Sequence, residues 1–500
     1  MKNLHFACVI WFLSLTLLAG CSLAFDKVET DATLTPELAV PLLETQMRLD
    51  KLMEGLGANS YLQVNNDGTF KMQYRGTFAE SPSFNILSAL PASIVIPLVN
   101  EKTVAPFPSP VGMEIDSIDL KKGIFKWQIS NPHAIDLEIN LVVKELTNAD
   151  GVFETTFLLP ANLSDLGGEI DLNGWRLKST AGKIVLECKA TNNNNKYSVS
   201  GNYEFKNLEP KKIIGYMGQK TLSINEQSLG FDFFKKWSQQ GEVRFLEPQL
   251  TLTFSNAIGV PMFVKTRIAE ATKTDGTKVV FDSPLTTGIN IAYPSLSEMG
   301  SAKTQSLIVK TTNSNIADVL NAYPTSLTFA LDTYLNPDAG KKTVGHIIDT
   351  AKVKFKMDMD IPLLATVKNF VVLDTLDVDL SKFNQITNAE FKVITDNSLP
   401  LDMGLQAYFL AADKTVIDSL VTNSALILKS APTFRGTVVG VTTSTNLINM
   451  AAEKFSKIQG AKKIAIKYIM STAVSGSEPV ILKADQKFSL RLGVKTSVKL

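Results

Sequence analysis

The sequence is poor in the residues that most often carry metal and acid–base chemistry. It has three histidines in 500 residues, and the two that follow residue 21, His133 and His346, lie far apart in the chain. We expect His133 to be a solvated loop residue and His346 to lie near the start of a strand. Patterns such as His-Glu-x-x-His, Cys-x-x-Cys, Gly-x-Ser-x-Gly and Gly-x-x-x-x-Gly-Lys do not occur. We therefore expect no enzymatic activity, no metal and no cofactor.

An excess of either charge is also lacking. The chain has 50 basic and 49 acidic residues, and no block of like charges. This balance argues against a nucleic-acid partner and against a charged interaction tail. After residue 21 no apolar run reaches the 18 or so residues that a membrane helix needs. Any attachment to a membrane is therefore expected at the N-terminus.

The N-terminus has the three-part pattern of a secretory signal: Lys2, an apolar run from Phe6 to Leu18, and small residues before Cys21. The segment Leu18-Ala19-Gly20-Cys21 resembles the lipobox of bacterial lipoproteins. The resemblance implies cleavage before Cys21 and acyl chains, palmitate among them, on its sulfur and new amino group. It predicts a signal peptide over residues 1–20 and a tether over 21–35. An ordinary signal peptide cut nearby, or an uncleaved anchor helix, are the alternatives.

Cysteine is too scarce for a disulfide framework. Of the three cysteines, Cys8 would leave with the signal and Cys21 would carry lipid. Cys188 is then alone, so no intrachain disulfide is expected. It lies in a strand-like apolar run, which predicts a buried and unreactive thiol.

From residue 113 onward apolar and polar residues alternate, as in half-buried strands. Phe125, Trp127 and Ile129 are one example, and the last 13 residues give the longest. Turn-forming residues predict tight hairpins between several of these runs. The predicted hairpin turns are Asp67-Gly68, Asp150-Gly151, Asn173-Gly174, Asn192–Asn195 and Asp275-Gly276.

Few segments have helical spacing of apolar residues. We expect a helix from Leu42 to Leu56, with Pro41 in its first turn, and another from Thr445 to Ile458, near Ala451. Short helices are expected over 84–90 and 315–320. Three prolines between Ala105 and Pro110 predict a linker.

A diffuse repeat recurs at intervals that suit whole domains. In each copy a strand ends in a polar break with asparagine, at Asn131, Asn256 and Asn397, and a second alternation follows. Residues 327–337 form a looser fourth copy. Asparagine suits the break because its side chain closes an Asx turn.

The order strand, Asn-Pro break, strand is similar to the sandwich domains of the late-embryogenesis-abundant and water-stress (WHy) group. The chain after the signal also resembles large β-rich lipoproteins of Bacteroidota, a family without an assigned activity. Residues 215–219, 233–237 and 256–261, with Pro248, carry this likeness. It implies an outer-membrane anchor and no catalytic residues.

These patterns predict a mainly β protein, built of several antiparallel β-sandwich-like modules with a few short helices. We expect a helix and hairpin segment over 36–110, and three modules that together cover the rest of the chain. The expected modules are 111–245, 246–370 and 371–500, the last with one helix.

Two groups of residues are candidates for a site. The aromatic residues Phe231, Phe233, Phe234 and Trp237 could form a binding patch, although packing into a core is the interpretation that we favour. The carboxylate pairs Asp358/Asp360 and Asp377/Asp379 alternate with apolar residues, which a solvated sheet face explains fully.

The leading hypothesis is a non-enzymatic outer-membrane lipoprotein that acts as a scaffold or partner-binding subunit of an envelope complex. A lipid carrier with an apolar groove is the alternative, and a carbohydrate-binding surface protein is the weaker one. No dense acidic run follows Cys21, which slightly favours the periplasmic face over the cell surface. Partners would be the membrane and an outer-membrane protein complex.

Overall fold

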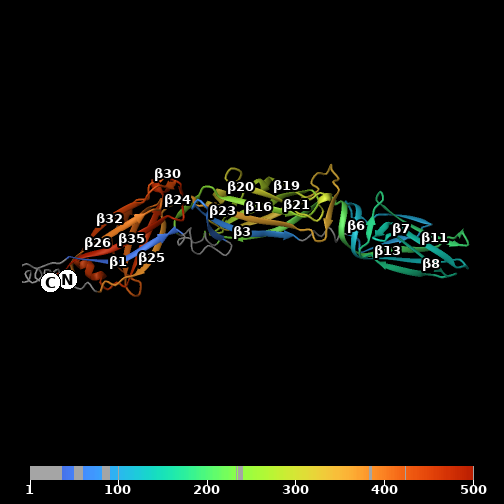
Figure 1. Cartoon of the computed structure of the whole chain (residues 1–500), viewed down its shortest axis with the longest axis horizontal. Helices are drawn as coiled ribbons and strands as arrows, with labels where there is room; N and C mark the ends of the chain where they lie inside the picture. The colour runs from blue at the N-terminus through green and yellow to red at the C-terminus, as the bar shows by residue number, and fades with distance from the viewer. Residues whose placement is uncertain are drawn as a thin grey trace, which may run out of the picture.

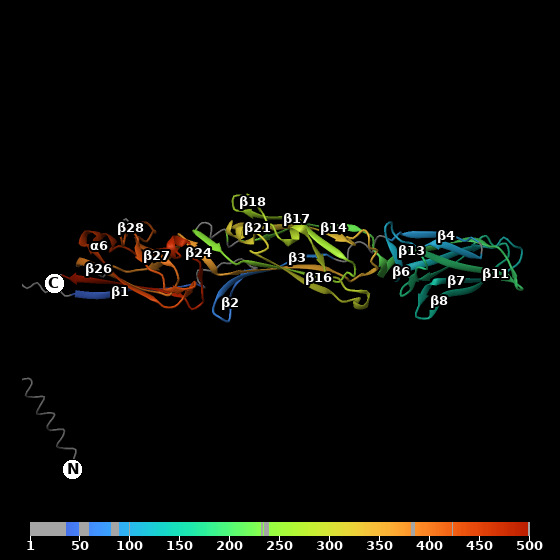
Figure 2. The same ribbon diagram turned by 90° about the horizontal axis from the view of Figure 1, so that it is seen from above.

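The computed structural model describes residues 37–49, 60–81, 90–99, 101–231, 234, 240–381, 386–422 and 424–498. These residues form three β-rich modules that follow one another in a line, so the molecule is a rod (Figure 1). Figure 2 shows the same order from above. Strands dominate and the helices are short, which confirms the predicted mainly β fold. In the described residues no helix is long and apolar enough to cross a bilayer.

The module at one end, which we call the distal module, is built on two strands of 17 residues each, β6 (Glu114–Ser130) and β13 (Ser200–Tyr216). Phe125 and Phe205 lie opposite each other on these strands, with ring centroids 4.6 Å apart in the core. The other strands of its sheet are β4 (Ser93–Pro97), β5 (Lys102–Pro106), β7 (Leu137–Asn148), β8 (Gly151–Leu159), β9 (Leu166–Asp171), β10 (Arg176–Lys178), β11 (Lys183–Asn192), β12 (Asn195–Lys196) and β22 (Gly345–Ile348).

The middle module contains two five-stranded sheets. One has the order β2 (Ser60–Val64), β3 (Phe70–Ser81), β23 (Val353–Pro362), β16 (Gln249–Asn256), β20 (Lys303–Lys310). The other has the order β14 (Lys220–Gly230), β21 (Pro324–Leu335), β17 (Met262–Lys273), β18 (Lys278–Val280), and β19 (Ile289–Ile291) also pairs with β17. Short helical segments connect these strands: α4 (Pro284–Thr287), η2 (Leu296–Glu298) and α5 (Ile316–Asn321).

The third module, which we call the proximal module, packs two sheets face to face. Between the sheets, the ring centroid of Phe391 lies 5.9 Å from that of Phe409. The ring centroid of Tyr468 lies 5.7 Å from that of Phe488. One sheet has the order β1 (Glu37–Arg48), β35 (Lys487–Val498), β26 (Ile386–Asn397), β32 (Thr442–Ala451). The other has the order β25 (Phe370–Asp377), β33 (Lys463–Ser471), β27 (Asp402–Leu410), β28 (Val416–Ser419), with β29 (Leu426–Leu428) on β27.

Small elements lie in the proximal module and at its junction with the middle module. Figure 1 shows β24 between the middle and proximal modules, where it joins a three-stranded sheet. These elements are β15 (Glu242–Phe245), β24 (Leu364–Lys368), β34 (Val480–Ile481), β30 (Thr433–Phe434), β31 (Thr437–Val438), α6 (Ala452–Ile458) and α7 (Ala473–Gly476).

The path of the chain runs out along the rod and back. Strand β1 belongs to the proximal module and β3 to the middle module, and β4 to β13 then build the distal module. The later strands, apart from β22 on the distal sheet, return through the middle and proximal modules. The first described residue, Glu37, lies opposite Ser497 of the last strand, so both ends of the described chain meet at one tip.

The helix predicted from Leu42 was wrong up to Arg48, because residues 42–48 belong to strand β1. Leu49 is helical, and residues 50–56 lie outside the described residues. The apolar spacing of residues 42–48 suits either state, and pairing along β35, with a register shift between Pro41 and Leu43, decides for the strand. The helix predicted from Thr445 was likewise wrong in its first half. Strand β32 pairs with β26 up to Ala451, and only α6 is helical.

Two turn predictions also need correction. Strands β9 and β10 flank Asn173-Gly174 but do not pair with each other, because both lie along β6. Part of the expected linker, up to Pro106, is strand β5, which pairs with β11. Local sequence marks a turn, but the neighbouring strand decides where the chain goes next.

Four hairpins were predicted correctly: those at Asp67-Gly68, Asp150-Gly151, Asn192–Asn195 and Asp275-Gly276. Helix α5 confirms the short helix expected over 315–320, and β35 confirms the long final strand. The short helix expected over 84–90 lies, apart from Leu90, outside the described residues.

The repeated asparagine has the same role in all three modules. Asn131, Asn256 and Asn397 end or directly follow β6, β16 and β26, and are at most 1% exposed. Each Oδ1 accepts the backbone N–H of the residue two further on, at 2.8–2.9 Å, which confirms the predicted Asx turns. Each Nδ2 donates to backbone carbonyls of another segment, such as those of Leu159, Ala292 and Lys429. We call this arrangement the asparagine clamp.

Replacing a clamp residue should destabilise the module that contains it. In Asn397→Ala the buried carbonyl of Leu401 and the part-buried carbonyl of Lys429 lose a donor, for an expected cost of about 2 kcal/mol or more. The exposed hairpin residue Asn195 is the control, and Asn195→Ala should stay within about 0.5 kcal/mol. Urea unfolding, monitored by hydrogen exchange in the strands of each module, measures the loss of stability in both variants. Equal transitions in the two variants would contradict a stabilising clamp.

Candidate functional site

The aromatic residues proposed as a binding patch belong to the core wherever the structure describes them. Phe231 and Phe234 are 2% and 0% exposed. Phe231 contacts Tyr74 edge to face at 5.4 Å, and Phe234 contacts Phe245 at 6.3 Å. Large rings gain most from burial, so these two form no surface patch. The other members, Phe233 and Trp237, and the predicted lipidation residue Cys21 lie outside the described residues.

The two histidines cannot share a site. The His133 ring contacts the carbonyl of Ser198 just before β13 begins, whereas His346 pairs with Ile214 near the end of β13. At the usual rise per residue these places are roughly 45 Å apart. His346 is fully buried against Gly259, and burial, with Lys212 nearby, lowers its pKa, which keeps the ring neutral.

The carboxylate pairs have ordinary surface partners. Asp358 and Asp360 lie opposite Arg75 and Gln73 of β3, and Gln73 Nε2 donates to Asp360 at 2.5 Å. Asp377 forms an ion pair with Lys463 at 2.7 Å. No group of three or more metal-ligating side chains occurs in the part of the chain that the structure describes. These contacts support the solvated sheet face predicted for the carboxylates.

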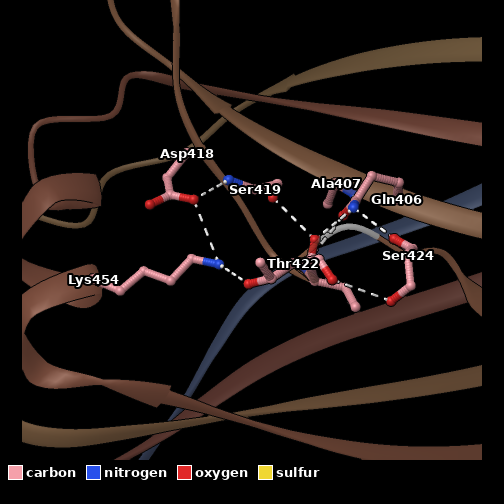
Figure 3. Close-up of polar contacts among 8 residues, drawn as sticks. Gln406, Ala407, Asp418, Ser419, Thr422, Ser424 and Lys454 are labelled. Carbon is pink, nitrogen blue, oxygen red and sulfur yellow. Dashed lines mark hydrogen bonds and ion pairs between the residues drawn. The ribbon is translucent and has the colours of Figure 1, made fainter.

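A polar network in the proximal module attaches α6 to the loop after β28 (Figure 3). Lys454 of α6 donates to Thr422 at 3.0 Å and lies 3.4 Å from Asp418. The buried amide of Gln406 donates to the carbonyls of Val421 and Ser424, and its oxygen accepts two backbone N–H groups. Both the nitrogen and the oxygen of the Gln406 amide already have hydrogen-bond partners within the protein, so we assign this network a structural role.

Cys188 is 2% exposed in β11, as predicted for an unreactive thiol. Burial raises its pKa to about 11. The thiolate that would act as a nucleophile is therefore scarce at neutral pH, and Cys188 does not provide a catalytic centre.

The feature best suited to a ligand is a groove that the sequence did not reveal. It has a volume of about 640 Å³ and lies where β14, β17 and β21 reach the end of the middle module next to β13. Its lining residues, all among those described, include two lysines and two aromatic rings but no carboxylate: Gln219, Lys220, Thr221, Phe263, Lys265, Thr287, Tyr334, Leu335, Asn336 and Pro337. We call it the β14–β17 groove.

Strand register builds one wall of this groove. Phe263 of β17 lies opposite Tyr334 of β21, which lies opposite Thr221 of β14. The two rings are 6.1 Å apart, with an angle of 52° between their planes. Lys265 is two residues beyond Phe263 and therefore points to the same face. The carboxylate nearest in register, Asp332, already accepts from Ser223 and pairs with Arg267.

A sequence signal for this site does exist, but it is weak. Phe263-x-Lys265 and Asp332-x-Tyr334 place aromatic and charged residues on what period two makes the outer face of each strand. Only the register between strands that are distant in sequence brings the rings together.

The other end of the groove is formed by Asn336, whose Oδ1 has no hydrogen-bond partner in the described structure.

Cys188 should resist thiol reagents until the protein unfolds. In a chain of residues 22–500, in which it is the only cysteine, we expect little reaction with a disulfide reagent at pH 8 and one equivalent in denaturant. Absorbance of the released thiol measures both reactions. Rapid stoichiometric labelling of the folded protein would contradict the buried thiol.

Comparisons with known proteins identify no family. No protein-family model and no curated protein matches the sequence. Among solved structures, the chain is similar to a "putative secreted protein" from Parabacteroides distasonis, at 10% identity and a TM-score of 0.33, over 92% of this chain and 99% of that one. It is also similar to a structure of infectious bursal disease virus, at 6% identity and a TM-score of 0.14, covering 89% and 82% of the two chains. An archaeal virus protein with a triple jelly-roll fold gives 9% identity and a TM-score of 0.11, covering 92% and 90%.

Proposed function

We propose that this protein is a non-enzymatic outer-membrane lipoprotein, anchored at one tip of its rod, that holds a partner-binding module at the other tip. It would act as a scaffold or subunit of an envelope complex, on the periplasmic face. The observation that carries the proposal is that both ends of the described chain lie at one tip, where Glu37 pairs with Ser497. The distal module, residues 93–216 with β22, lies at the opposite tip (Figure 1).

The rod geometry fits an anchor near Cys21. Residues 21–35, the predicted tether, would connect the acyl chains directly to β1 at the proximal tip. The two further modules would then lie between the membrane and the distal module. Such spacing has a use when a partner must be held away from the bilayer surface.

The distal module exposes large apolar side chains of the kind that a partner can cover. Val95 of β4, Val104 of β5 and Leu158 of β8 are 62%, 51% and 61% exposed. Scattered exposed apolar residues are common, and the proximal module has some as well, Val416 among them at 61%. Position at the free tip, rather than exposure alone, is therefore the reason to assign partner contact to the distal module.

The cavity that the described residues enclose between two modules does not favour a lipid-carrying role. The apolar cavity between the middle and proximal modules, lined by residues such as Leu49, Phe245 and Met470, has a volume of about 50 Å³. Ligand pockets usually hold about 300–1,000 Å³, so this cavity is too small for an acyl chain. Filled cores are what a scaffold requires.

Anchoring can be tested at Cys21. We expect Cys21→Ser to release the protein from the membrane fraction and to abolish incorporation of labelled palmitate, whereas Ser22→Ala should keep both. Fractionation of the native envelope and lipid labelling measure these outcomes. Membrane retention of Cys21→Ser would overturn the lipid anchor.

Partner binding can be tested by isolating the lipidated protein from its native envelope in mild detergent, with proteins and lipids identified by mass spectrometry. We expect a stoichiometric outer-membrane protein partner, lost in Val95→Glu and kept in the equally exposed control Val416→Glu. Bound lipid at a fixed ratio without a partner would contradict the scaffold and favour the carrier.

A further inference from the structure

We propose that the β14–β17 groove binds a short acidic saccharide, a chain of a few sugar rings that carry carboxylate, sulfate or phosphate groups. The groove is in the middle module, away from both tips, so this activity is separate from anchoring and from partner contact at the distal module. Its volume of about 640 Å³ lies within the range of small-ligand sites. The inference rests on the kinds of side chain that line it and on how strand register arranges them.

The aromatic wall provides faces for sugar rings. Phe263 and Tyr334 are half-buried, so each ring is held by the sheet but remains accessible from the groove. Ring faces attract the weakly positive C–H groups of an apolar ligand surface, such as one side of a pyranose. The angle of 52° between the rings suits two successive sugar rings that are twisted relative to each other better than one flat ligand.

The charge of the groove selects an anion. Lys220 and Lys265 both line it, and neither has a carboxylate partner within ion-pair distance among the described residues. No Asp or Glu is among the lining residues, and Asp332, which lies opposite Lys265 on β21, pairs with Arg267. The lining therefore carries two positive charges although the chain is nearly neutral. A partly enclosed site with one sign of charge concentrates ligands of the opposite sign.

Uncharged polar groups complete a lining that suits hydroxyl-rich ligands. Thr221 and Thr287 are exposed in the groove. The hydroxyl of Thr221 can donate and accept, whereas that of Thr287 donates to the carbonyl of Pro284 at 3.0 Å and can accept from a ligand. Gln219 donates to the carbonyl of Asn336, which leaves its side-chain oxygen as an acceptor. The buried Oδ1 of Asn336 has no partner in the described structure, and a buried acceptor of this kind is normally satisfied by water or ligand.

The site is rigid before any ligand arrives. The row Phe263, Tyr334 and Thr221 spans three paired strands, and rigid strands position side chains more accurately than loops do. Gly288 makes room for the ring of Phe263, because a Cβ there would lie 2.2 Å from the ring tip. A preorganised site loses less entropy on binding than one that must form around its ligand.

The test titrates the folded chain of residues 22–500 with trigalacturonate by calorimetry. Maltotriose, a neutral saccharide with the same number of rings, is the matched control ligand, and inorganic phosphate and uridine diphosphate are added as competitors. We expect trigalacturonate to bind in the micromolar to millimolar range, and maltotriose to bind at least about tenfold more weakly.

Variants separate the aromatic from the ionic contribution. We expect the double variant Lys220→Gln/Lys265→Gln to weaken trigalacturonate about tenfold or more, and Tyr334→Ala to weaken both saccharides. The double variant Lys310→Gln/Lys356→Gln removes two exposed lysines from the other sheet of the same module and should bind like the parent. Thermal unfolding confirms that each variant is folded.

Several results would overturn the proposal. One is the absence of binding heat with trigalacturonate at about 10 mM, and another is equal affinity for the two saccharides. A third is an equal loss of trigalacturonate affinity in Lys220→Gln/Lys265→Gln and in the control Lys310→Gln/Lys356→Gln. Tighter binding of uridine diphosphate, or full displacement by millimolar phosphate, would assign the groove to nucleotides or to simple anions instead. The anchor and partner experiments use Cys21 and Val95, so their failure leaves this result unaffected.

Discussion

The antiparallel pairing of β1 with β35 is the interaction on which the rod depends. It joins residues about 450 positions apart in sequence and places β1 at the edge of the proximal sheet. Strand β3 also pairs with a strand far away in sequence, because in the middle module it lies between β2 and β23. Two modules therefore remain incomplete until the first eighty residues are paired with strands that follow much later. Because such distant contacts must overcome the entropy of long loops, we expect the modules to fold cooperatively and slowly.

This pairing also explains which elements could be predicted from sequence. Alternation and turn residues are local, so the long strands, four hairpins and the Asx turns at Asn131, Asn256 and Asn397 were accessible. The helices expected from Leu42 and Thr445 were wrong because both segments pair with strands far away in sequence, β35 and β26. In both segments the spacing of apolar residues allows either state, and hydrogen bonding to a distant partner selects the strand.

The groove was hidden for the same physical reason. In the sequence, Phe263 and Tyr334 each look like a single outward-facing residue of an ordinary strand. Lys220 looks like a residue that precedes a strand. Their meeting depends on the register of β17 on β21 and of β21 on β14, which includes irregular steps in both pairs. A shift of one residue would turn each ring to the opposite face. By contrast, Phe231 and Phe234 formed a visible cluster in sequence, but the fold buries them.

Comparison of the asparagines connects the architecture to the candidate site. Asn336 ends the looser fourth copy of the repeat, and its Nδ2 donates to the buried carbonyl of Gly218, so half of the clamp is retained. Its φ of 47° differs from those of the three clamp residues, none of which has a positive φ. Proline is not the cause, since one follows Asn131 as well. The left-handed backbone directs the chain away from the Asx turn, so Oδ1 is left without the N–H that satisfies it elsewhere. The copy of the repeat that departs from the clamp is therefore the one that contributes to the groove.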